Sequence, residues 1–179
     1  MTLPPFSRPG LLAAAGLLAL GLHATTQAQP SNWKEPDNWQ ELEQAPPVGF
    51  NPQDVVPFEI TVYSSLQFGV VPATVTLGTD GVVRYVLVAR SATAQTVLYE
   101  GLRCSTRQTK TYARWSSDSG AAGGTWQTMA GADWRPVTEG NASRPAWTLA
   151  KLAFCDGATP NGDARRMLRE LRYGRPTTN

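Results

Sequence analysis

The stretch that decides the fold is Thr79–Arg90, TDGVVRYVLVAR, in the middle of the chain. The pair Asp80-Gly81 is typical of a tight hairpin turn, because these residues tolerate the positive φ that such a turn needs. The run that follows, Val82–Arg90, is apolar on both faces apart from Arg84, which indicates a central strand rather than an edge strand. Together with the β-branched run Ala73–Gly78 before the turn, this stretch predicts a β-hairpin at the centre of a sheet.

Further strands are predicted on either side of this hairpin. Residues Phe58–Tyr63 alternate between apolar and polar with a period of two, which is the pattern of a half-buried strand. Two later runs, Thr96–Cys104 and Arg107–Trp115, predict the next pair of strands, and Thr125–Met129 predicts a short return strand. The segment around Pro136 is expected to be an edge or irregular piece, because proline has no N–H to donate to a ladder.

The last part of the chain carries two helical patterns. Ser143–Cys155 has Pro145 in its first turn and apolar residues at helical spacing. Asp163–Tyr173 begins with a favourable N-cap residue and is followed by Gly174, a common helix stop. The predicted fold is therefore α+β: an antiparallel β-sheet of about five to six strands with two C-terminal helices packed on one face.

Cys104 and Cys155 are the only cysteines in the sequence. In an oxidising compartment they are expected to form one disulfide, which would close a loop of about 50 residues and contribute roughly 4 kcal/mol. The alternative is a redox pair, but there is no Cys-x-x-Cys spacing, and Arg103 is the only basic neighbour of either thiol. A structural disulfide is the favoured interpretation.

The N-terminus has the features of a secretory signal peptide. Arg8 supplies a positive charge, Leu11–Leu22 is an uninterrupted run of apolar residues and glycine, and small residues at Thr26 and Ala28 suit cleavage. Because the apolar run is shorter than the roughly 20 residues that span a bilayer, cleavage near Ala28 and release into the periplasm are predicted, with no stable membrane anchor. Cleavage would also remove His23, the only histidine, and with it imidazole catalysis and histidine-ligated metal sites.

The predicted organisation is a signal peptide at residues 1–28, a Pro-rich acidic arm at 29–57, a single α+β domain at 58–174 and a tail at 175–179. The arm contains Trp33 and Trp39. Large aromatic side chains favour order only when they bury area, so we expect the arm to pack onto the domain. The alternative is an arm that recognises a partner.

The composition narrows the functional classes. With 41% apolar and 17% charged residues the chain suits one globular domain. The 16 Lys and Arg residues nearly balance the 14 Asp and Glu residues, so no nucleic-acid partner is predicted. The sequence contains no P-loop and no dinucleotide fingerprint, and neither a cofactor nor a metal site is predicted.

Cations concentrate on the predicted hairpins. The candidate interaction residues are Arg84, Arg90, Glu100, Arg103, Arg107 and Lys110, with Arg114 nearby. One interpretation is a surface for an acidic glycan, lipid headgroup or peptide. The favoured interpretation is a solvated face that the acidic arm partly neutralises.

Glu100 also has two interpretations, and no catalytic residue is assigned. The favoured one is a structural ion pair across strands with Arg84 or Arg90. The alternative is a catalytic acid acting with Asp118 or Asp133, since paired carboxylates cleave glycosides without imidazole.

Two further clusters have an ordinary and a functional interpretation. Trp115, Trp126 and Trp134 are expected to be packing residues, with a sugar-stacking platform as the alternative. The arginines of the last helix are expected to form a solvated face, with contact to anionic lipid as the alternative. These arginines are Arg165, Arg166, Arg169 and Arg172.

Several strings resemble the cryptic neisserial protein-like family. They are Val56–Phe58, Asp80–Ser91, Tyr99–Cys104 (YEGLRC) and Trp134–Arg135, within a similarity that spans Phe50 to Leu171. The resemblance implies an exported proteobacterial protein of a family without a settled activity, cofactor or substrate, and it provides no catalytic residues.

The sequence therefore favours an exported periplasmic protein that binds or supports a cell-envelope component without catalysis, its partner being an envelope protein or glycan. A second hypothesis is a histidine-independent, carboxylate-based hydrolase or lyase that acts on envelope glycan. A third is a folding helper for outer-membrane proteins, which would need an exposed apolar groove.

Overall fold

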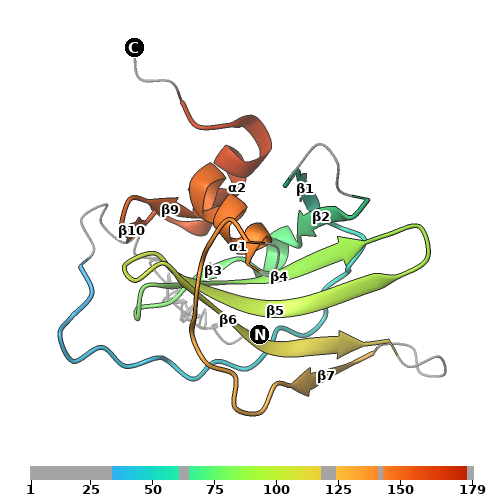
Figure 1. Cartoon of the computed structure of the whole chain (residues 1–179), viewed down its shortest axis with the longest axis horizontal. Coiled ribbons are helices and arrows are strands. Elements are labelled where there is room, and N and C mark those ends of the chain that lie inside the picture. The colour runs from blue at the N-terminus through green and yellow to red at the C-terminus, as the bar shows by residue number, and fades with distance from the viewer. Residues whose placement is uncertain (1–33, 61–64, 118–123, 141–142, 177–179) are drawn as a thin grey trace, which may run out of the picture.

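The computed structural model describes residues 34–60, 65–117, 124–140 and 143–176. A central antiparallel sheet carries helices α1 (Arg144–Leu149) and α2 (Ala164–Tyr173) on one side, and the arm runs along the other side as an extended chain (Figure 1). The predicted α+β class is confirmed: the structure has a sheet of several antiparallel strands, two helices near the C-terminus and one disulfide. The signal peptide predicted at 1–28 lies outside the described residues.

The main sheet has the strand order β1-β2-β4-β5-β6-β7, and the short strands β3 and β8 pair with β4 and β6. The strand bounds are β1 Val56–Phe58, β2 Gln67–Val70, β3 Thr76–Leu77, β4 Val82–Arg90, β5 Gln95–Arg103, β6 Gln108–Ser116, β7 Thr125–Thr128 and β8 Arg135–Pro136. A separate two-stranded sheet joins β9 (Cys155–Asp156) to β10 (Thr159–Pro160). The connections between the long strands are tight, as the predicted hairpins require.

Strand β4 is central and buried on both faces, as its apolar pattern predicts. On one face Val83, Tyr85 and Leu87 belong to the core beneath the helices. On the other face Val86 and Val88 belong to a second, smaller core. Because side chains alternate along a strand, nine consecutive residues can supply both cores at once.

The predicted disulfide between Cys104 and Cys155 is present, with 5.6 Å between the Cα atoms. Cys104 directly follows β5, and Cys155 follows a short π-helix, Ala150–Phe154, that continues α1. The bond therefore fastens the first helical segment to the end of a central strand. Leu102 lies in the core beneath the helices, as its shared parity with Cys104 predicts.

Helix α2 begins and ends where the sequence indicates. The Asp163 side chain accepts a hydrogen bond from the Arg166 N–H and caps the helix, and Gly174 follows the last residue with a φ of 82°. The buried residues Met167 and Leu171 face the core. The helix that was predicted to run unbroken from Ser143 to Cys155 is instead an α-helix that widens into the π-helix, and Cys155 already belongs to β9.

The strand predicted at Phe58–Tyr63 is wrong in its extent. Strand β1 ends at Phe58, which pairs with Phe68 of β2, and the next residues, Glu59 and Ile60, are not in a strand. Residues 61–64 lie outside the described part of the chain. Strand β2 itself was not predicted, since its four residues include Gly69 and form no alternating run.

The run Ala73–Gly78 is also only partly a strand. Pro72 begins a 3-10 turn, Pro72–Thr74, and β3 is limited to Thr76–Leu77. The Thr74 hydroxyl donates to the Val71 carbonyl (2.7 Å) and accepts from the Val86 N–H (2.9 Å). The Thr74 side chain thus accepts a hydrogen bond from the Val86 N–H, which would otherwise pair with the backbone of a longer β3.

Candidate functional site

The acidic arm lies directly on cations of the hairpins. The Glu35 carboxylate accepts hydrogen bonds from Arg103 Nη2 (2.6 Å) and Nε (3.3 Å) and from the Ser105 hydroxyl (2.6 Å). The Arg103 guanidinium also lies 3.5 Å from the centroid of a Trp39 ring and 5.4 Å from that of Trp134. Arg103 is consequently enclosed by an anion and two aromatic rings, which leaves its side chain 11% exposed.

A second contact of the arm closes over a buried ion pair. Arg84 donates to both carboxylate oxygens of Asp80, at 3.1 and 2.7 Å, and is 1% exposed. The backbone of Leu42 completes the site: its N–H donates to Asp80 (3.0 Å) and its carbonyl accepts from Arg84 (2.9 Å). Burial acts to raise the pKa of Asp80, but the hydrogen bonds from Arg84 and Leu42 outweigh it and hold that pKa below its ordinary value.

The third contact joins Glu41 to Lys110. The Lys110 ammonium lies 2.9 Å from Glu41 Oε2, and the Trp134 indole N–H donates to the same oxygen at 3.2 Å. Burial acts to raise the pKa of Glu41, but the hydrogen bonds from Lys110 and Trp134 and the charge of Lys110 help to lower it overall. The Tyr112 ring lies across Gly101, where a Cβ would come within 2.5 Å of the tyrosine oxygen, so this packing requires glycine.

Two of the hairpin cations, Arg103 and Lys110, are paired with carboxylates of the arm, and Arg90 donates to the carbonyl of Pro52, also in the arm. The arm thus partly neutralises these cations, as the favoured interpretation expects. The expected solvation is wrong for Arg84 and Arg103, whose side chains are 1% and 11% exposed. The sequence missed the partner of Arg84, because Asp80 was interpreted only as a turn residue. The four-residue separation of these two opposite charges was the available signal.

The predicted ion pair of Glu100 with Arg84 or Arg90 is wrong. In the register of β4 and β5, Arg84 lies opposite Gly101 and Tyr85 lies opposite Glu100. Arg84 and Glu100 therefore point to opposite faces of the sheet, and no shift of side-chain rotamer brings them together.

Glu100 is instead a buried carboxyl within the core region. It is 8% exposed and accepts hydrogen bonds from the Tyr85 hydroxyl and the Thr111 hydroxyl, each at 3.2 Å. Burial raises the pKa of Glu100 above its ordinary value. The hollow bordered by Asp133 is lined by Thr111 and not by Glu100. Asp118, the other proposed partner, lies outside the described residues.

Of the candidate interaction residues, Arg107 differs from the rest. Its guanidinium has no hydrogen bond or ion pair with any described residue, and its side chain is exposed. Its backbone has a φ of 51°, in the left-handed region that residues other than glycine seldom adopt. The turn between β5 and β6 imposes this conformation, as the Arg107 N–H closes back on the Cys104 carbonyl at 3.4 Å.

Arg107 lines a pocket of about 440 Å³ beside the disulfide. The pocket walls come from four separated parts of the chain: the β5–β6 turn with Arg103 and Arg107, Val137 after β8, the segment from Trp147 to Gly157, and Arg175 after α2. Both disulfide cysteines belong to the lining, so the bond holds two of the four walls together.

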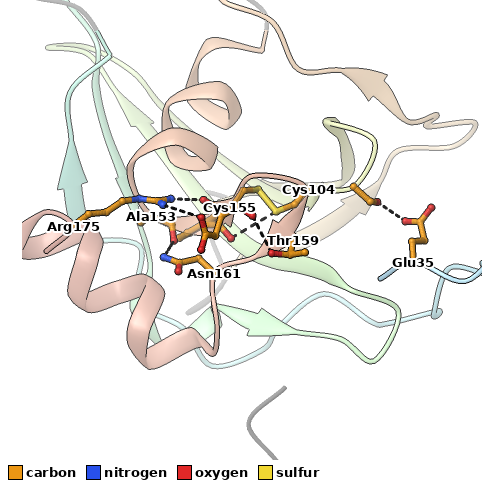
Figure 2. Close-up of a disulfide and its surroundings, with 10 residues drawn as sticks. Glu35, Cys104, Ala153, Cys155, Thr159, Asn161 and Arg175 are labelled. Carbon is orange, nitrogen blue, oxygen red and sulfur yellow. Dashed lines mark hydrogen bonds and ion pairs between the residues drawn. A yellow bond between two sulfur atoms is a disulfide. The ribbon is translucent and has the colours of Figure 1, made fainter. Parts of the chain in front are cut away.

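The cationic groups around the pocket are positioned by different means. Arg175 donates to the carbonyls of Leu152 (3.2 Å) and Cys155 and lies 3.7 Å from Glu170. The Lys151 ammonium lies 4.4 Å from the ring centroid of Trp147, one helical turn earlier. Figure 2 shows Arg175 and Glu35 on opposite sides of the disulfide, so both ends of the described chain meet the region around this bond.

Four cations line the pocket, and none of the described lining residues is acidic. Arg103 is paired with Glu35, and Arg175 lies within 3.9 Å of Asp156 and 3.7 Å of Glu170. Arg107 and Lys151 have no carboxylate partner among the described residues, so these two cations are the ones available to an anion. Sequence reasoning found Arg103 and Arg107 but missed Lys151, Trp147 and Arg175. The spacing of Trp147 and Lys151 on one helix was a usable signal, whereas the approach of Arg175 depends on the tertiary fold.

The tryptophans and two of the four arginines of α2 have local partners. Trp126 packs against Phe50 and Trp115, with centroids 5.4 and 5.1 Å apart, and its indole N–H donates to the Pro47 carbonyl. This agrees with the packing interpretation. On α2, Arg166 lies 2.9 Å from Glu170 and Arg165 lies 3.4 Å from Asp163.

The described residues contain neither a metal-binding cluster nor a membrane-spanning helix. Within the ranges described above, no cluster of three or more His, Cys, Asp or Glu side chains is placed to bind a metal ion. In the same ranges, no helix is long and apolar enough to cross a membrane.

Comparison with known proteins gives a family match. A family model described as the CNP1-like family matches residues 34–172, which takes in the arm, the sheet and both helices. No curated protein and no solved structure matches the chain. The family match agrees with the resemblance carried by the strings around Asp80–Ser91 and Tyr99–Cys104.

Proposed function

The chain belongs to the CNP1-like family, and we propose that it is an exported, non-enzymatic binding protein that holds an anionic group of a cell-envelope component in the pocket beside its disulfide. Export is proposed from the apolar run Leu11–Leu22 and the small residues before Gln29. The disulfide is consistent with an oxidising compartment such as the periplasm.

The observation that carries the proposal is Arg107. A non-glycine residue at a φ of 51° is uncommon, and a local strain of this kind persists only where the surrounding structure over-determines the backbone. Arg107 lines the pocket together with three further cations, and its side chain has no hydrogen bond or ion pair with a described residue. A guanidinium is suited to a carboxylate, sulfate or phosphate, because its planar N–H groups match two oxygens of the anion.

The size and lining of the pocket define the ligand further. A volume of about 440 Å³ accommodates a headgroup or one or two sugar rings and not a long chain. Trp147 provides an aromatic wall next to Lys151. The ligand class is therefore a small anionic group attached to a polar scaffold, either the phosphate of a lipid headgroup or the carboxylate of an acidic glycan.

The hydrolase hypothesis has no comparable support. Glu100 is buried, accepts hydrogen bonds from Tyr85 and Thr111, and does not line the hollow next to Asp133. No described second carboxylate contacts it. The proposal therefore rests on binding alone.

Calorimetric titration of the full chain with inorganic phosphate at low ionic strength tests the proposal. We expect saturable binding, with Arg107→Ala and Lys151→Ala each weakening it about tenfold, the loss of one charged hydrogen bond. The matched control is Arg169→Ala, which removes an exposed arginine of α2 outside the pocket and should leave the affinity unchanged. Equal affinities for all four proteins would contradict the proposal.

The source of the anion is distinguished by two further titrations. Phosphatidylglycerol vesicles present a lipid phosphate, and an oligosaccharide of uronic acids presents glycan carboxylates. The source is the one whose binding is lost in Arg107→Ala and kept in Arg169→Ala. Binding that both variants lose equally would be a general effect of charge.

A further inference from the structure

The surface beneath the arm has the charged, aromatic and backbone contacts of a recognition site. We define the arm groove as Asp80, Arg84, Arg103, Lys110, Tyr112 and Trp134. We propose that the arm groove is a binding site for an acidic, tryptophan-containing extended segment, and that its ligand between molecules is residues 35–42 of a second copy of this chain, through exchange of arms.

The groove contacts the arm through charged and aromatic side chains, as a binding site contacts a ligand, and not through a continuous apolar core. Glu35 is held by two bonds from Arg103, Trp39 stacks on the same guanidinium, and Glu41 is held by Lys110. Each contact is specific for charge or for an aromatic face. Opposite charges on the two sides of an interface select the partner and its register.

The groove also binds the backbone of the arm. Leu42 places its N–H on Asp80 and its carbonyl on Arg84, so the buried ion pair presents one acceptor and one donor to an extended chain. The Trp39 indole N–H donates to the Asp80 carbonyl at 2.8 Å. These bonds depend only on the segment from Glu35 to Leu42 and not on which chain supplies it.

The connector between this segment and the domain has the character of a hinge. Residues 43–49 include Pro46-Pro47, and Val48 is 89% exposed. The bond from Trp126 to the Pro47 carbonyl anchors the connector at its domain end. A stiff, exposed proline connector is a known setting for the exchange of an element between protomers, since opening it loses few contacts.

Exchange preserves every contact. In a two-fold dimer each arm would lie in the groove of its partner, and each groove would be filled by an identical segment. Tethering favours the closed monomer, because the effective concentration of a short linked segment is on the order of millimolar. Exchange is therefore expected when the chain is concentrated or when the contacts within one molecule are weakened.

Charge reversal provides a decisive test in the full chain. In Glu35→Arg the arm repels its own Arg103, and in Arg103→Glu the groove repels its own Glu35. In a mixture of the two variants, exchange of arms matches Arg with Glu in both grooves at once. We expect the mixture to form a heterodimer of twice the monomer mass, measured by light scattering after gel filtration and by native mass spectrometry.

The double variant Glu35→Arg/Arg103→Glu is the matched control, because its opposite charges are restored within one molecule and it should remain monomeric. A mixture that stays monomeric, while both single variants keep their disulfide and their circular dichroism, would overturn the proposal. Should either variant fail to fold, the pair Glu41→Lys and Lys110→Glu repeats the test at an independent contact. Arg103 also lines the pocket beside the disulfide, so the Glu41 and Lys110 pair is the test that is separate from the proposed function, because neither residue lines that pocket.

Discussion

Arg107 illustrates how one residue can be placed against its own conformational preference. A left-handed backbone costs an L-residue roughly 1–2 kcal/mol, and the turn between β5 and β6 would accept glycine at this position. The chain instead has an arginine that lines the pocket. Under the proposed function, this arginine serves binding rather than stability.

This explanation predicts that replacing Arg107 by glycine raises the stability of the fold and weakens phosphate binding. Arg107→Gly should raise the free energy of unfolding by about 0.5–1 kcal/mol, because the relief of strain exceeds the extra entropy of glycine in the unfolded chain. Phosphate binding should weaken about tenfold in the same variant, because the guanidinium is removed. Urea denaturation measures the first effect and calorimetry the second.

Arg107→Ala is the control, since alanine keeps the strained backbone and lacks only the guanidinium. It should show the same weakening of binding, about tenfold, without a gain in stability. A glycine variant less stable than wild type would show that the arginine side chain holds the turn, contrary to our account.

The individual site residues were predictable to different degrees. Arg107 and Arg103 stood out from the sequence as unbalanced cations on a hairpin. The partners of Arg84 and Glu100 did not, because the hairpin register decides which side chains share a face, and a shift of one residue reverses it. Arg175 comes to the pocket only through the path of the chain after α2.

Among the elements, the disulfide decides whether the pocket has a fixed shape. It joins the end of β5 to the start of β9 and closes a loop with a sequence separation of 51 residues. Two of the pocket walls belong to these two elements. The bond is therefore both a staple for the fold and part of the site.

Removing the disulfide should affect stability and binding together. For Cys104→Ala/Cys155→Ala we expect a loss of about 4 kcal/mol in the free energy of unfolding, measured with urea. Phosphate affinity should fall as well, since Arg107 and Lys151 are no longer held at a fixed separation. Wild-type protein treated with a reductant is the control, and a loss below about 1 kcal/mol in both cases would contradict the structural role of the bond.

The elements were predicted well where local chemistry and tertiary contacts agree. Three elements are determined by local features of the sequence. These features are the Asp80-Gly81 turn, the apolar residues on both faces of β4 and the Asp163 cap of α2. Strand β1 ends earlier than its alternation indicates, at Phe58, which pairs with Phe68 of β2. Whether a strand has a neighbour to pair with depends on the tertiary structure, and the periodicity of the sequence does not reveal it.

In the molecule as a whole, the arm brings its carboxylates onto the cationic side of the sheet. Asp80 and Glu41 have pKa values below their ordinary 3.8 and 4.5, because their ionised forms accept hydrogen bonds at the contact between arm and sheet. Glu100 has the opposite shift, since burial favours its protonated form in the folded protein. These shifts make stability depend on pH in opposite directions.

The stability supplied by Asp80 and Glu41 is fully present above their ordinary pKa values and is lost as the pH falls through their lower values in the folded protein. Glu100 contributes stability at pH values below its ordinary 4.5, and this is lost as the pH rises through its higher folded value. We therefore expect Asp80→Asn to lose about 3–5 kcal/mol at neutral pH, where it leaves the buried Arg84 without a counter-ion. The loss should shrink as the pH falls below 3.8, the ordinary value of the aspartate.

Urea unfolding of wild type and Asp80→Asn between pH 7 and pH 3 measures this dependence. Asp54→Asn is a suitable control, because the Asp54 side chain is exposed and has no hydrogen bond or ion pair with a described residue. A loss for Asp80→Asn that is constant over the whole range would show that its ionisation does not stabilise the fold.

The central claim, that the pocket beside the disulfide binds an anion, is tested most directly by mapping where phosphate binds. Nuclear magnetic resonance of isotope-labelled protein, including the arginine side-chain N–H signals, follows each cation separately during a phosphate titration. Our account predicts saturating shifts at Arg107, Lys151 and Arg175 with a common dissociation constant. Unchanged signals there, or shifts confined to the exposed arginines of α2, would contradict it.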